Sequence, residues 1–561
     1  MSSPFAFERV RVQGIVRELG EGESVVLDRA CNAAGCTPAD VLDWSLFRRS
    51  IDARGRRAPR FEHIVDLEIP AAAAALARTR PRVAAAPAPT LRPTVRVPSS
   101  SARPVVIGMG PCGLFAALQL AEAGLRPVVI DRGKPVESRA KDVSRLMNHG
   151  ELNPNSNLCF GEGGAGTWSD GKLYTRVGGP RIREILDSLV RLGAPDRILV
   201  DGRPHLGTDR LVAILKAFRR TLGEAGCELR FDHVVAGIEC DAHGAVQGVR
   251  TSDGEVIPAS HVVLAPGHSA RDLYRTLAVE GVAMAPKPFA MGFRIEHPQA
   301  LIDDIQYTRW AHHEELPAAY YELTANLQDG DQRRGVYSFC MCPGGSVVPT
   351  PSDEGELCIN GMSHAARSGR YANSALVVTV EPSDYAPFEG DEPGFGKLLA
   401  GMSFQRRVEA AAFHAGGGAF TAPAQRASDY LDGRVRDVRR TTYKRGVNPA
   451  DLRPLYPERL TATLQQALRT FQQRMPGYLS DEAVLLGVET RTSAPVTILR
   501  DRVTLQSLSH AGLYPAGEGA GYGGGIVSAA IDGLKVADAI LATITGEAPV
   551  VDDDSAGSAD Q

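Results

Sequence analysis

The chain has little cysteine and no long hydrophobic run. Its nine cysteines in 561 residues are an odd number, unlike the even disulfide framework of a small secreted domain. No run of about 18 apolar residues occurs, so no transmembrane helix is predicted. The first residues, MSSPFAFERVRVQG, lack the basic region, apolar stretch and cleavage site of a secretory signal. These absences predict a cytoplasmic protein with reduced thiols and no membrane partner.

The chain also lacks a large excess of charge of either sign. Lys and Arg number 62 against 66 Asp and Glu, a formal net charge of −4. Proteins that bind nucleic acid carry a basic excess, so we expect no nucleic-acid partner and favour a small-molecule substrate. The 43% hydrophobic and 23% charged residues are ordinary for a globular protein. The 58 glycines follow no collagen-like period, and they predict tight turns and close backbone approaches.

The length predicts several domains, because domains average about 150 residues. Residues 1–70 predict a small α+β unit, with strand-like alternation at Val10–Val16 and Phe61–Ile69 and a helix at Glu23–Ala34 between them. Residues 71–102 are rich in Ala, Pro and Ser and predict an exposed linker, part of it a short helix. Residues 546–561 predict a disordered acidic tail.

A dinucleotide-binding pattern follows the expected linker. The apolar strand Val105–Ile107 leads into Gly-Met-Gly-Pro-Cys-Gly and an apolar helix, and a second strand ends at Asp131. In this pattern the first glycine permits the tight turn, the second admits a pyrophosphate, and the third lets helix and strand pack. Amides at the helix N-terminus then face the phosphates. The residues expected to bind the cofactor here are Gly108, Gly110, Pro111, Gly113, Asp131 and Arg132.

The C-terminal part of the chain indicates which dinucleotide is bound. A short strand opens at Gly517-Glu518 into a glycine-rich turn and a helix. An acid at that strand end suits a ribityl hydroxyl, and the glycines suit a pyrophosphate. NAD needs no such second element, whereas the longer FAD does, so we expect FAD. A middle strand, Val262–Leu264, ends in Ala-Pro-Gly. The further residues expected to bind FAD are Val235, Gly267, Gly517, Glu518, Gly524, Gly525 and Ile526.

These three elements resemble the FAD-binding fold of the glutathione-reductase/p-hydroxybenzoate-hydroxylase superfamily. More closely, the chain is similar to the bacterial family of uncharacterised FAD-dependent dehydrogenases, or NAD(P)/FAD-dependent oxidoreductases. Pro266 and Glu518 depart from the residues common in such proteins, Thr and Asp. The stretches that carry the resemblance are Asn157–Leu173, Pro204–Asp209, Gly267–Asp272, Gly487–Ser493 and, in the N-terminal unit, Arg48–Arg54.

We therefore expect an α/β fold with a discontinuous, Rossmann-like FAD-binding domain. Its two parts are residues 103–290 and 484–545. An α+β cap or substrate domain, residues 291–483, is inserted between them, and the small N-terminal α+β unit precedes both. The flavin is then expected in the cleft between domains, where pockets usually form.

The segment Gly161–Lys172 is the candidate for wrapping the flavin, because its glycines permit close backbone approach. From it we expect Gly163, Gly164 and Ser169 to bind FAD, and Lys172 to act as a cation that tunes the flavin. The alternatives are a glycine-rich surface loop and a solvated lysine.

Two histidines and three arginines are candidates for substrate chemistry. His205 and His268 could act as acid–base groups, because imidazole titrates near neutral pH; the alternative is a histidine hydrogen-bonded within a turn. Arg294, Arg445 and Arg491 could each hold a carboxylate or phosphate, although surface positions or ion pairs are the commoner role.

The cysteines offer two further interpretations. Cys340-Met341-Cys342 could be a redox dithiol, but it lacks the helix N-terminal setting that lowers a thiol pKa, so packed reduced thiols are favoured. Cys31 and Cys36 have no partners at zinc spacing. We predict no metal site.

The sequence thus predicts an FAD-dependent oxidoreductase that transfers a hydride between an organic substrate and flavin N5. No second glycine fingerprint follows a strand, so an NAD(P)H donor would bind transiently, or the electron partner is a different molecule. Three alternatives remain open: an FAD-dependent RNA-modifying enzyme, which the acidic balance disfavours, a non-catalytic flavin-binding module, and a plain NAD dehydrogenase, which the C-terminal element disfavours.

Overall fold

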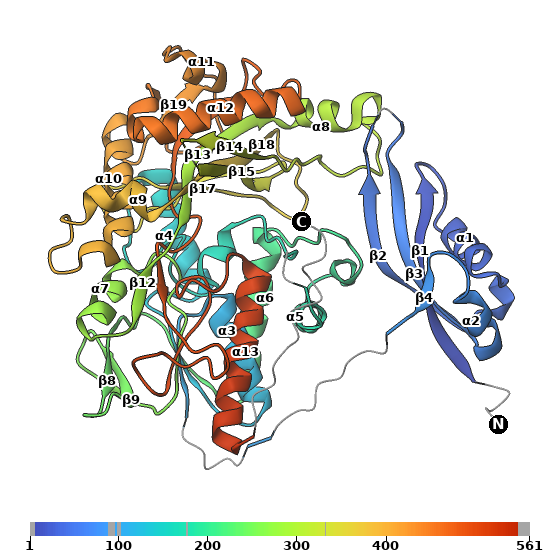
Figure 1. Cartoon of the computed structure of the whole chain (residues 1–561), viewed down its shortest axis with the longest axis horizontal. Helices are drawn as coiled ribbons and strands as arrows, with labels where there is room; N and C mark the ends of the chain where they lie inside the picture. Colours follow the sequence, from blue (N-terminus) through green and yellow to red (C-terminus); the bar gives the residue numbers. More distant parts are fainter. Residues whose placement is uncertain are drawn as a thin grey trace.

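A computed structural model describes residues 6–55, 57–87, 96–97, 103–175, 178–330 and 332–547 of the chain (Figure 1). Of the expected linker, residues 88–95 and 98–102 lie outside these ranges, and of the expected acidic tail only residues 546 and 547 lie within them. No helix within the described ranges is long and apolar enough to cross a membrane.

The N-terminal unit is a four-stranded antiparallel sheet with two helices on one face (Figure 1). Alternate residues of its central strand, such as Val65, Leu67 and Ile69, are fully buried against those helices. Residues 71–85, expected to be linker, also belong to this unit because they form α2 and an edge strand. The elements are β1 (Phe7–Glu18), α1 (Ser24–Ala34), β2 (Asp43–Asp52), β3 (Arg60–Pro70), α2 (Ala71–Ala77) and β4 (Val83–Ala85).

A five-stranded parallel sheet forms the second unit, and its three inner strands are short, rich in Val and Ile, and buried on both faces, as covered parallel strands usually are. The strand Leu513–Pro515, near the C-terminus, pairs with Val262–Leu264. The end of the chain therefore returns to the sheet that its first half forms. This arrangement confirms the expected α/β, Rossmann-like fold with an insertion. In spatial order the strands are β23 (Leu513–Pro515), β11 (Val262–Leu264), β5 (Val105–Ile107), β6 (Val128–Ile130) and β7 (Glu228–Arg230).

Helices and small sheets cover this unit. The helices are α3 (Pro111–Glu122), α4 (Val136–His149), α5 (Arg181–Arg191), α6 (Thr208–Glu224), α7 (Arg271–Val279) and α13 (Ile526–Thr545). The small antiparallel sheets are β8 (Val235–Cys240), β9 (Val246–Thr251) and β10 (Val256–Pro258), and the pair β12 (Met284–Pro286) and β22 (Val496–Ile498).

The inserted cap is built on a mixed seven-stranded sheet. Residues 484–489, expected to begin the second part of the FAD domain, form a strand of this sheet because they pair with β13 and β19. In spatial order the strands are β14 (Thr324–Asp329), β15 (Gln332–Cys342), β18 (Tyr371–Val380), β13 (Phe289–Pro298), β21 (Val484–Glu489), β19 (Ala422–Arg426) and β20 (Val447–Pro449). The cap also contains β16 (Ser346–Pro349), β17 (Ile359–Met362), α8 (Gln299–Tyr307), α9 (Pro382–Tyr385), α10 (Ala400–Ala415), α11 (Ala427–Asp432) and α12 (Glu458–Arg474).

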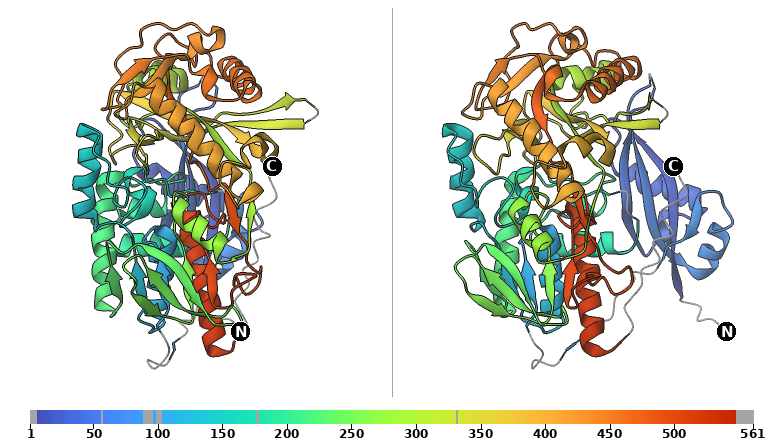
Figure 2. Two further views of the ribbon diagram at one scale, coloured as in Figure 1. Left: turned by 90° about the vertical axis from the view of Figure 1, so that its left-hand side faces the viewer. Right: turned by 60° about the vertical axis from the view of Figure 1, so that its left-hand side comes forward.

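The three units face a common centre. Figure 1 shows the cap above the parallel sheet and the N-terminal sheet to one side of both, and Figure 2 shows the β14–β15 hairpin projecting from the cap. The N-terminal unit contacts each of the others. Arg17 forms an ion pair with Glu315 at 2.7 Å, and the backbone of Arg49 exchanges hydrogen bonds with Val200 and Gly202.

Helices α3 and α13 lie side by side with their backbones in contact. A Cβ atom added at Gly533 of α13 would lie 2.1 Å from the carbonyl oxygen of Cys112 in α3. Real Cβ atoms do not approach backbone oxygen so closely, so the spacing of these helices requires glycine at this position.

We expect Gly533→Ala to lower the free energy of unfolding by about 1–3 kcal/mol, because overpacking forces a backbone shift. Thermal or urea unfolding measures this. Gly223→Ala in α6 is the matched control: its Cβ would meet nothing within 4 Å, and alanine there should stabilise the helix by up to about 1 kcal/mol. Equal stability of Gly533→Ala and wild type would contradict the close contact.

Candidate functional site: a cavity between two glycine-rich turns

A cavity of about 1920 Å³ lies where the three units meet. Its wall includes both glycine-rich segments, the loop before Lys172, the inner edge of the cap and one face of the N-terminal sheet. The sequence-predicted residues that line it are Gly108, Gly110, Pro111, Asp131, Arg132, Gly164, Ser169, Lys172, His205, Val235, Gly267, His268, Arg491, Gly517, Glu518, Gly524, Gly525 and Ile526.

The two glycine-rich turns touch each other although about 400 residues separate them in the chain. A Cβ atom on Gly517 would lie 2.8 Å from the Cβ of Cys112, and one on Gly519 would lie 2.5 Å from the carbonyl oxygen of Gly267. The turn at Gly108 has φ +97°, and a Cβ there would lie 2.2 Å from the oxygen of Ala265. Side chains at these positions would push apart the two turns and the segment Ala265–Gly267, which each of them contacts.

The turn before α3 forms an open cradle at the helix N-terminus. Gly110 is the N-cap residue and Pro111 the first residue of the helix. The nearest atom to a Cβ at Gly110 would be Cα of Gly164, 4.0 Å away, so this position faces free space. Unpaired amides and the helix dipole favour an anion here. The cradle fits a pyrophosphate.

Other residues of this pattern support the turn. Asp131 accepts hydrogen bonds from the amides of Met109 (2.8 Å) and Gly133 (2.9 Å), so its carboxylate fixes the turn as well as facing the cavity. Gly113 faces away from the cavity, because a Cβ there would lie 1.9 Å from the oxygen of Gly108. Arg132 lies over the ring of Phe160 at 4.5 Å and forms an ion pair with Asp272.

At the other turn, Glu518 faces the cavity. No described residue donates a hydrogen bond to its carboxyl group. Burial raises the pKa of this carboxyl to about 8, and the cation of Lys287 offsets only part of that rise. A buried carboxyl that lacks partners gains when a ligand brings hydroxyl groups to it. A ribityl chain does so, and the residues present therefore fit FAD.

The loop at residues 161–172 is held from behind by a buried arginine. Arg139, which is fully buried, donates to the carbonyl oxygens of Asn157 (2.8 Å), Leu158 (3.0 Å), Gly161 (3.2 Å), Glu162 (2.6 Å) and Gly164 (2.9 Å). Gly163 packs behind the cavity wall, since its Cβ would collide with Thr167. The sequence analysis did not select Arg139, although it lies within a helix next to this loop.

Both candidate histidines line the cavity. His268 is bonded to its neighbour in the chain, whereas His205 is bonded to the backbone of the cap. His205 Nε2 lies 3.2 Å from the oxygen of Ala365, and His268 Nδ1 lies 2.8 Å from Oγ of Ser269. Burial lowers the pKa of each imidazole to about 4, and nearby arginines add to the effect. Both rings are therefore neutral at pH 7.

Two of the three candidate arginines do not line the cavity. Arg294 is completely buried and forms an ion pair with Glu489 at 2.7 Å. Its other donors reach Asn360, Asn373 and the carbonyl oxygen of Cys340. Arg445 is on the surface and donates to backbone oxygens of Asn148 and Ala419. The structure therefore gives both residues structural bonds and places neither at the cavity, whereas Arg491 does line it.

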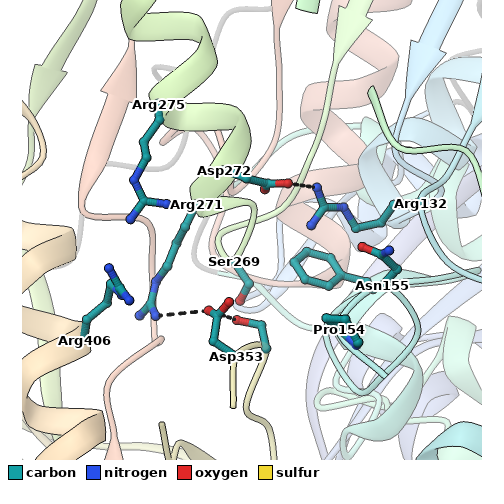
Figure 3. A pocket seen from close by; sticks show the side chains of 11 residues that line it. Arg132, Pro154, Asn155, Ser269, Arg271, Asp272, Arg275, Asp353 and Arg406 are labelled. Atoms are coloured by element: carbon teal, nitrogen blue, oxygen red, sulfur yellow. Dashed lines mark hydrogen bonds and ion pairs between the residues drawn. The ribbon is translucent and has the colours of Figure 1, made fainter. Parts of the chain in front are cut away.

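Arg491 belongs to a buried ion-pair network beside a second cavity of about 170 Å³. It holds Glu409, which Arg271 also binds at 2.8 Å, and the charges of these arginines keep the pKa of Glu409 below its usual value although burial opposes them. Figure 3 shows this second cavity, with Arg132 bonded to Asp272 and Arg271 directed at Asp353. Its other arginines, Arg275 and Arg406, are paired with Glu392 and Glu356.

Two comparisons establish the family of this chain. The family model "FAD-dependent protein, C-terminal domain-like" matches residues 288–492. An uncharacterised protein of Clostridium beijerinckii is 40% identical over 539 residues, 95% of this chain and 98% of that protein. The chain belongs to this bacterial family of FAD-dependent proteins. The resemblance to a bacterial family of FAD-dependent proteins and FAD as the cofactor are thereby confirmed.

Solved structures show only a distant likeness to this FAD-dependent protein. CtdE in complex with FAD is 12% identical with a TM-score of 0.29, over 78% of this chain and 84% of that chain. L-amino acid deaminase from Proteus vulgaris is 14% identical with a TM-score of 0.31, over 82% of this chain and 96% of that chain. Such scores carry no argument about the substrate.

No group of three or more His, Cys, Asp and Glu among the described residues is arranged to hold a metal ion.

We expect Gly110→Val to abolish FAD binding while the protein without FAD stays folded. The new side chain would enter the cradle, where the structure has no atom nearer than 4.0 Å to the Cβ position, and losing glycine at the N-cap should cost only about 1 kcal/mol. Flavin absorbance per protein and thermal unfolding measure the two effects. Gly390→Val, on an open surface, is the control. Stoichiometric FAD in Gly110→Val would show that the pyrophosphate lies elsewhere.

We expect Glu518 to lower the stability of the protein without FAD as the pH rises from about 4.5 to about 8. Over this range the unfolded chain has released the proton of Glu518, whereas the folded protein retains it because burial raises the pKa of that carboxyl. The unfolded state therefore binds fewer protons, and its free energy falls relative to the folded state.

Glu518→Gln should remove at least about 1 kcal/mol of this loss, measured by urea unfolding at pH 5 and pH 8.5. The exposed Glu224→Gln should behave as wild type. An identical pH dependence in Glu518→Gln and wild type would show that Glu518 ionises normally.

Proposed function

We propose that this FAD-dependent protein transfers a hydride between a small organic substrate and flavin N5 inside the 1920 Å³ cavity. FAD, when bound, supplies the two-electron chemistry. The protein then has to bind the cofactor, place the substrate and handle the accompanying proton.

One observation carries this proposal: a single cavity continues from the two glycine-rich turns to polar residues of the cap and the N-terminal sheet. Pockets in small-molecule enzymes combine a mainly apolar wall with a few placed polar groups. Beyond the turns, the wall contains the polar residues Asn360 and Glu489 of the cap, Lys172 and Tyr174, and Arg48 and Ser50 of the N-terminal sheet. This part of the cavity gives room for a substrate.

Lys172 is suited to hold negative charge that develops on a substrate. Its ammonium donates to the carbonyl oxygen of Met341 and lies 3.8 Å from the carboxylate of Asp170. Burial tends to lower the pKa of this lysine, but neighbouring negative groups, Cys340 and Asp170, outweigh burial and raise it. Lys172 is therefore a fixed cation in the wall of the cavity.

His205 is suited to accept a proton. Its backbone bridges to Lys172, so the two side chains belong to neighbouring segments of the wall. A bond from Nε2 to the carbonyl oxygen of Ala365 at 3.2 Å requires the hydrogen on Nε2, which leaves the Nδ1 lone pair as acceptor. Because the pKa is lowered to about 4, mainly by burial, the ring is in its basic form at pH 7. His268 is neutral for the same reason and is the second candidate base.

We expect the purified protein to contain one FAD and to be bleached by NADH or NADPH without oxygen, because reduction removes the flavin's visible absorbance. Stopped-flow absorbance measures the bleaching with each nucleotide. A protein that holds FAD but is bleached by neither would contradict NAD(P)H as the transient donor. A colourless protein that cannot be loaded with FAD would contradict the whole proposal. A salt-dependent shift in the electrophoretic mobility of tRNA when the protein is added would favour the RNA-modifying alternative.

A further inference from the structure

The cap places two cysteines at the cavity through a bulge in strand β15. Cys340-Met341-Cys342 ends this strand, and its pairing with β18 changes register between Phe339 and Cys342. Cys340 has φ +47°, a left-handed conformation that a residue with a side chain adopts only at an energetic cost. The bulge turns Cys340 to the cavity, whereas Cys342 is completely buried behind it.

Two cations surround this pair. Lys172 donates to the oxygen of Met341. Arg294 donates to the oxygen of Cys340 at 2.6 Å and lies 3.5 Å from the sulfur of Cys342. Reactive cysteines typically occupy such electropositive, partly exposed surroundings, because the thiolate is the nucleophile. Packed thiols are favoured by the sequence alone because no helix N-terminus precedes the motif, but Lys172 and Arg294 supply the positive charge from distant parts of the chain.

The two thiols have different pKa values, and a redox pair needs one thiolate and one protonated thiol. The Cys342 thiol donates to the carbonyl oxygen of Cys340 at 3.3 Å. The nearness of this thiol, together with Lys172 and Arg294, holds the pKa of Cys340 well below its usual value. The pKa of Cys342 is raised by the bond to Cys340 and by burial. Cys340 is thus the thiolate and Cys342 the protonated thiol of the pair.

Cys340 lines the same cavity as Glu518. Glu518 is the residue that we assign to the ribityl chain, so the thiol and the residue assigned to the cofactor face one continuous cavity.

We propose that Cys340 and Cys342 form a redox-active pair that carries two electrons from the bound flavin to the substrate, and that the substrate is a small disulfide, which the thiols reduce in place of a direct hydride transfer. This inference rests on the proposed function, because it needs a flavin in the cavity. It reverses the interpretation favoured from the sequence alone.

The electrons and protons balance as follows. The Cys340–Cys342 disulfide receives two electrons and one proton from the reduced flavin; its S–S bond breaks, Cys340 becomes a thiolate beside Lys172, and Cys342 becomes a thiol. The Cys340 thiolate then attacks the substrate disulfide, forming a mixed disulfide and releasing one thiolate, which takes a proton from solvent. Cys342 loses its proton and attacks Cys340, so the internal disulfide forms again and the second substrate thiol leaves with that proton.

The first test needs no flavin and no turnover. Protein without FAD is oxidised with diamide, its free thiols are alkylated, and mass spectrometry locates the blocked cysteines. We expect an internal Cys340–Cys342 disulfide that dithiothreitol reverses. Cys159 is the internal control: it also lines the cavity, but its thiol bonds the oxygen of Thr350 at 3.6 Å, and it should stay alkylatable.

The second test counts electrons in the FAD-bound protein. Anaerobic titration of the diamide-oxidised protein with dithionite should consume two more electrons per FAD than the flavin alone. Cys340→Ser and Cys342→Ser should each lose those two electrons, whereas Cys159→Ser should keep them. The reduced wild type should then reduce 5,5′-dithiobis(2-nitrobenzoic acid), a small aromatic disulfide, at least about tenfold faster than either pair variant.

The outcomes separate the two proposals. A flavin that takes up only its own two electrons, with both cysteines alkylatable after diamide, overturns the thiol pair and leaves the flavin function intact. A protein that binds no FAD overturns the proposed function itself. Because the wild type alone gives the disulfide and electron counts, a variant that fails to fold does not weaken the test.

Discussion

The account depends on the direct contact of two backbone turns at the edge of one parallel sheet. Gly517 and Gly519 face Cys112 and Gly267 at distances that leave no room for a Cβ, and Gly533 brings helix α13 against α3. The contact brings the start and the end of the FAD-binding unit together, so that the intervening residues form a cap over the cavity. This geometry suits an elongated dinucleotide whose diphosphate and ribityl chain we expect to be bound by different turns.

Buried ion pairs join the cap to the flavin-binding unit and fix strands within the cap. Arg271 of α7 pairs with Glu409 of cap helix α10, which Arg491 also binds, and Arg294 pairs with Glu489 between two strands of the cap sheet. Burying such charges costs solvation free energy, and removing one partner leaves the other uncompensated. These arginines therefore support the wall of the cavity, and Arg294 acts on the cavity only through Glu489 and the oxygen of Cys340.

Local sequence patterns made much of the fold predictable. The features that could not be predicted depend on contacts between residues that are far apart in the chain. The strand, glycine turn and helix around Gly110 are specified within about 20 residues, so the FAD fold could be predicted. The membership of Val484–Glu489 in the cap sheet could not, because it depends on pairing with β13 almost 200 residues earlier. Arg294 and Arg445 were candidates for substrate binding because guanidinium groups suit anions, but burial and backbone bonds are invisible in one sequence. The charge around Cys340 was missed for the same reason.

Hydrogen exchange tests the central claim most directly. Amide exchange is compared for the protein with and without FAD, and peptides that cover residues 108–113 and 517–525 are followed. If one FAD molecule spans both turns, adding it should slow exchange in both segments together and at the same FAD concentration. Protection of one segment alone, or of two segments at different FAD concentrations, would contradict a single cofactor held between them.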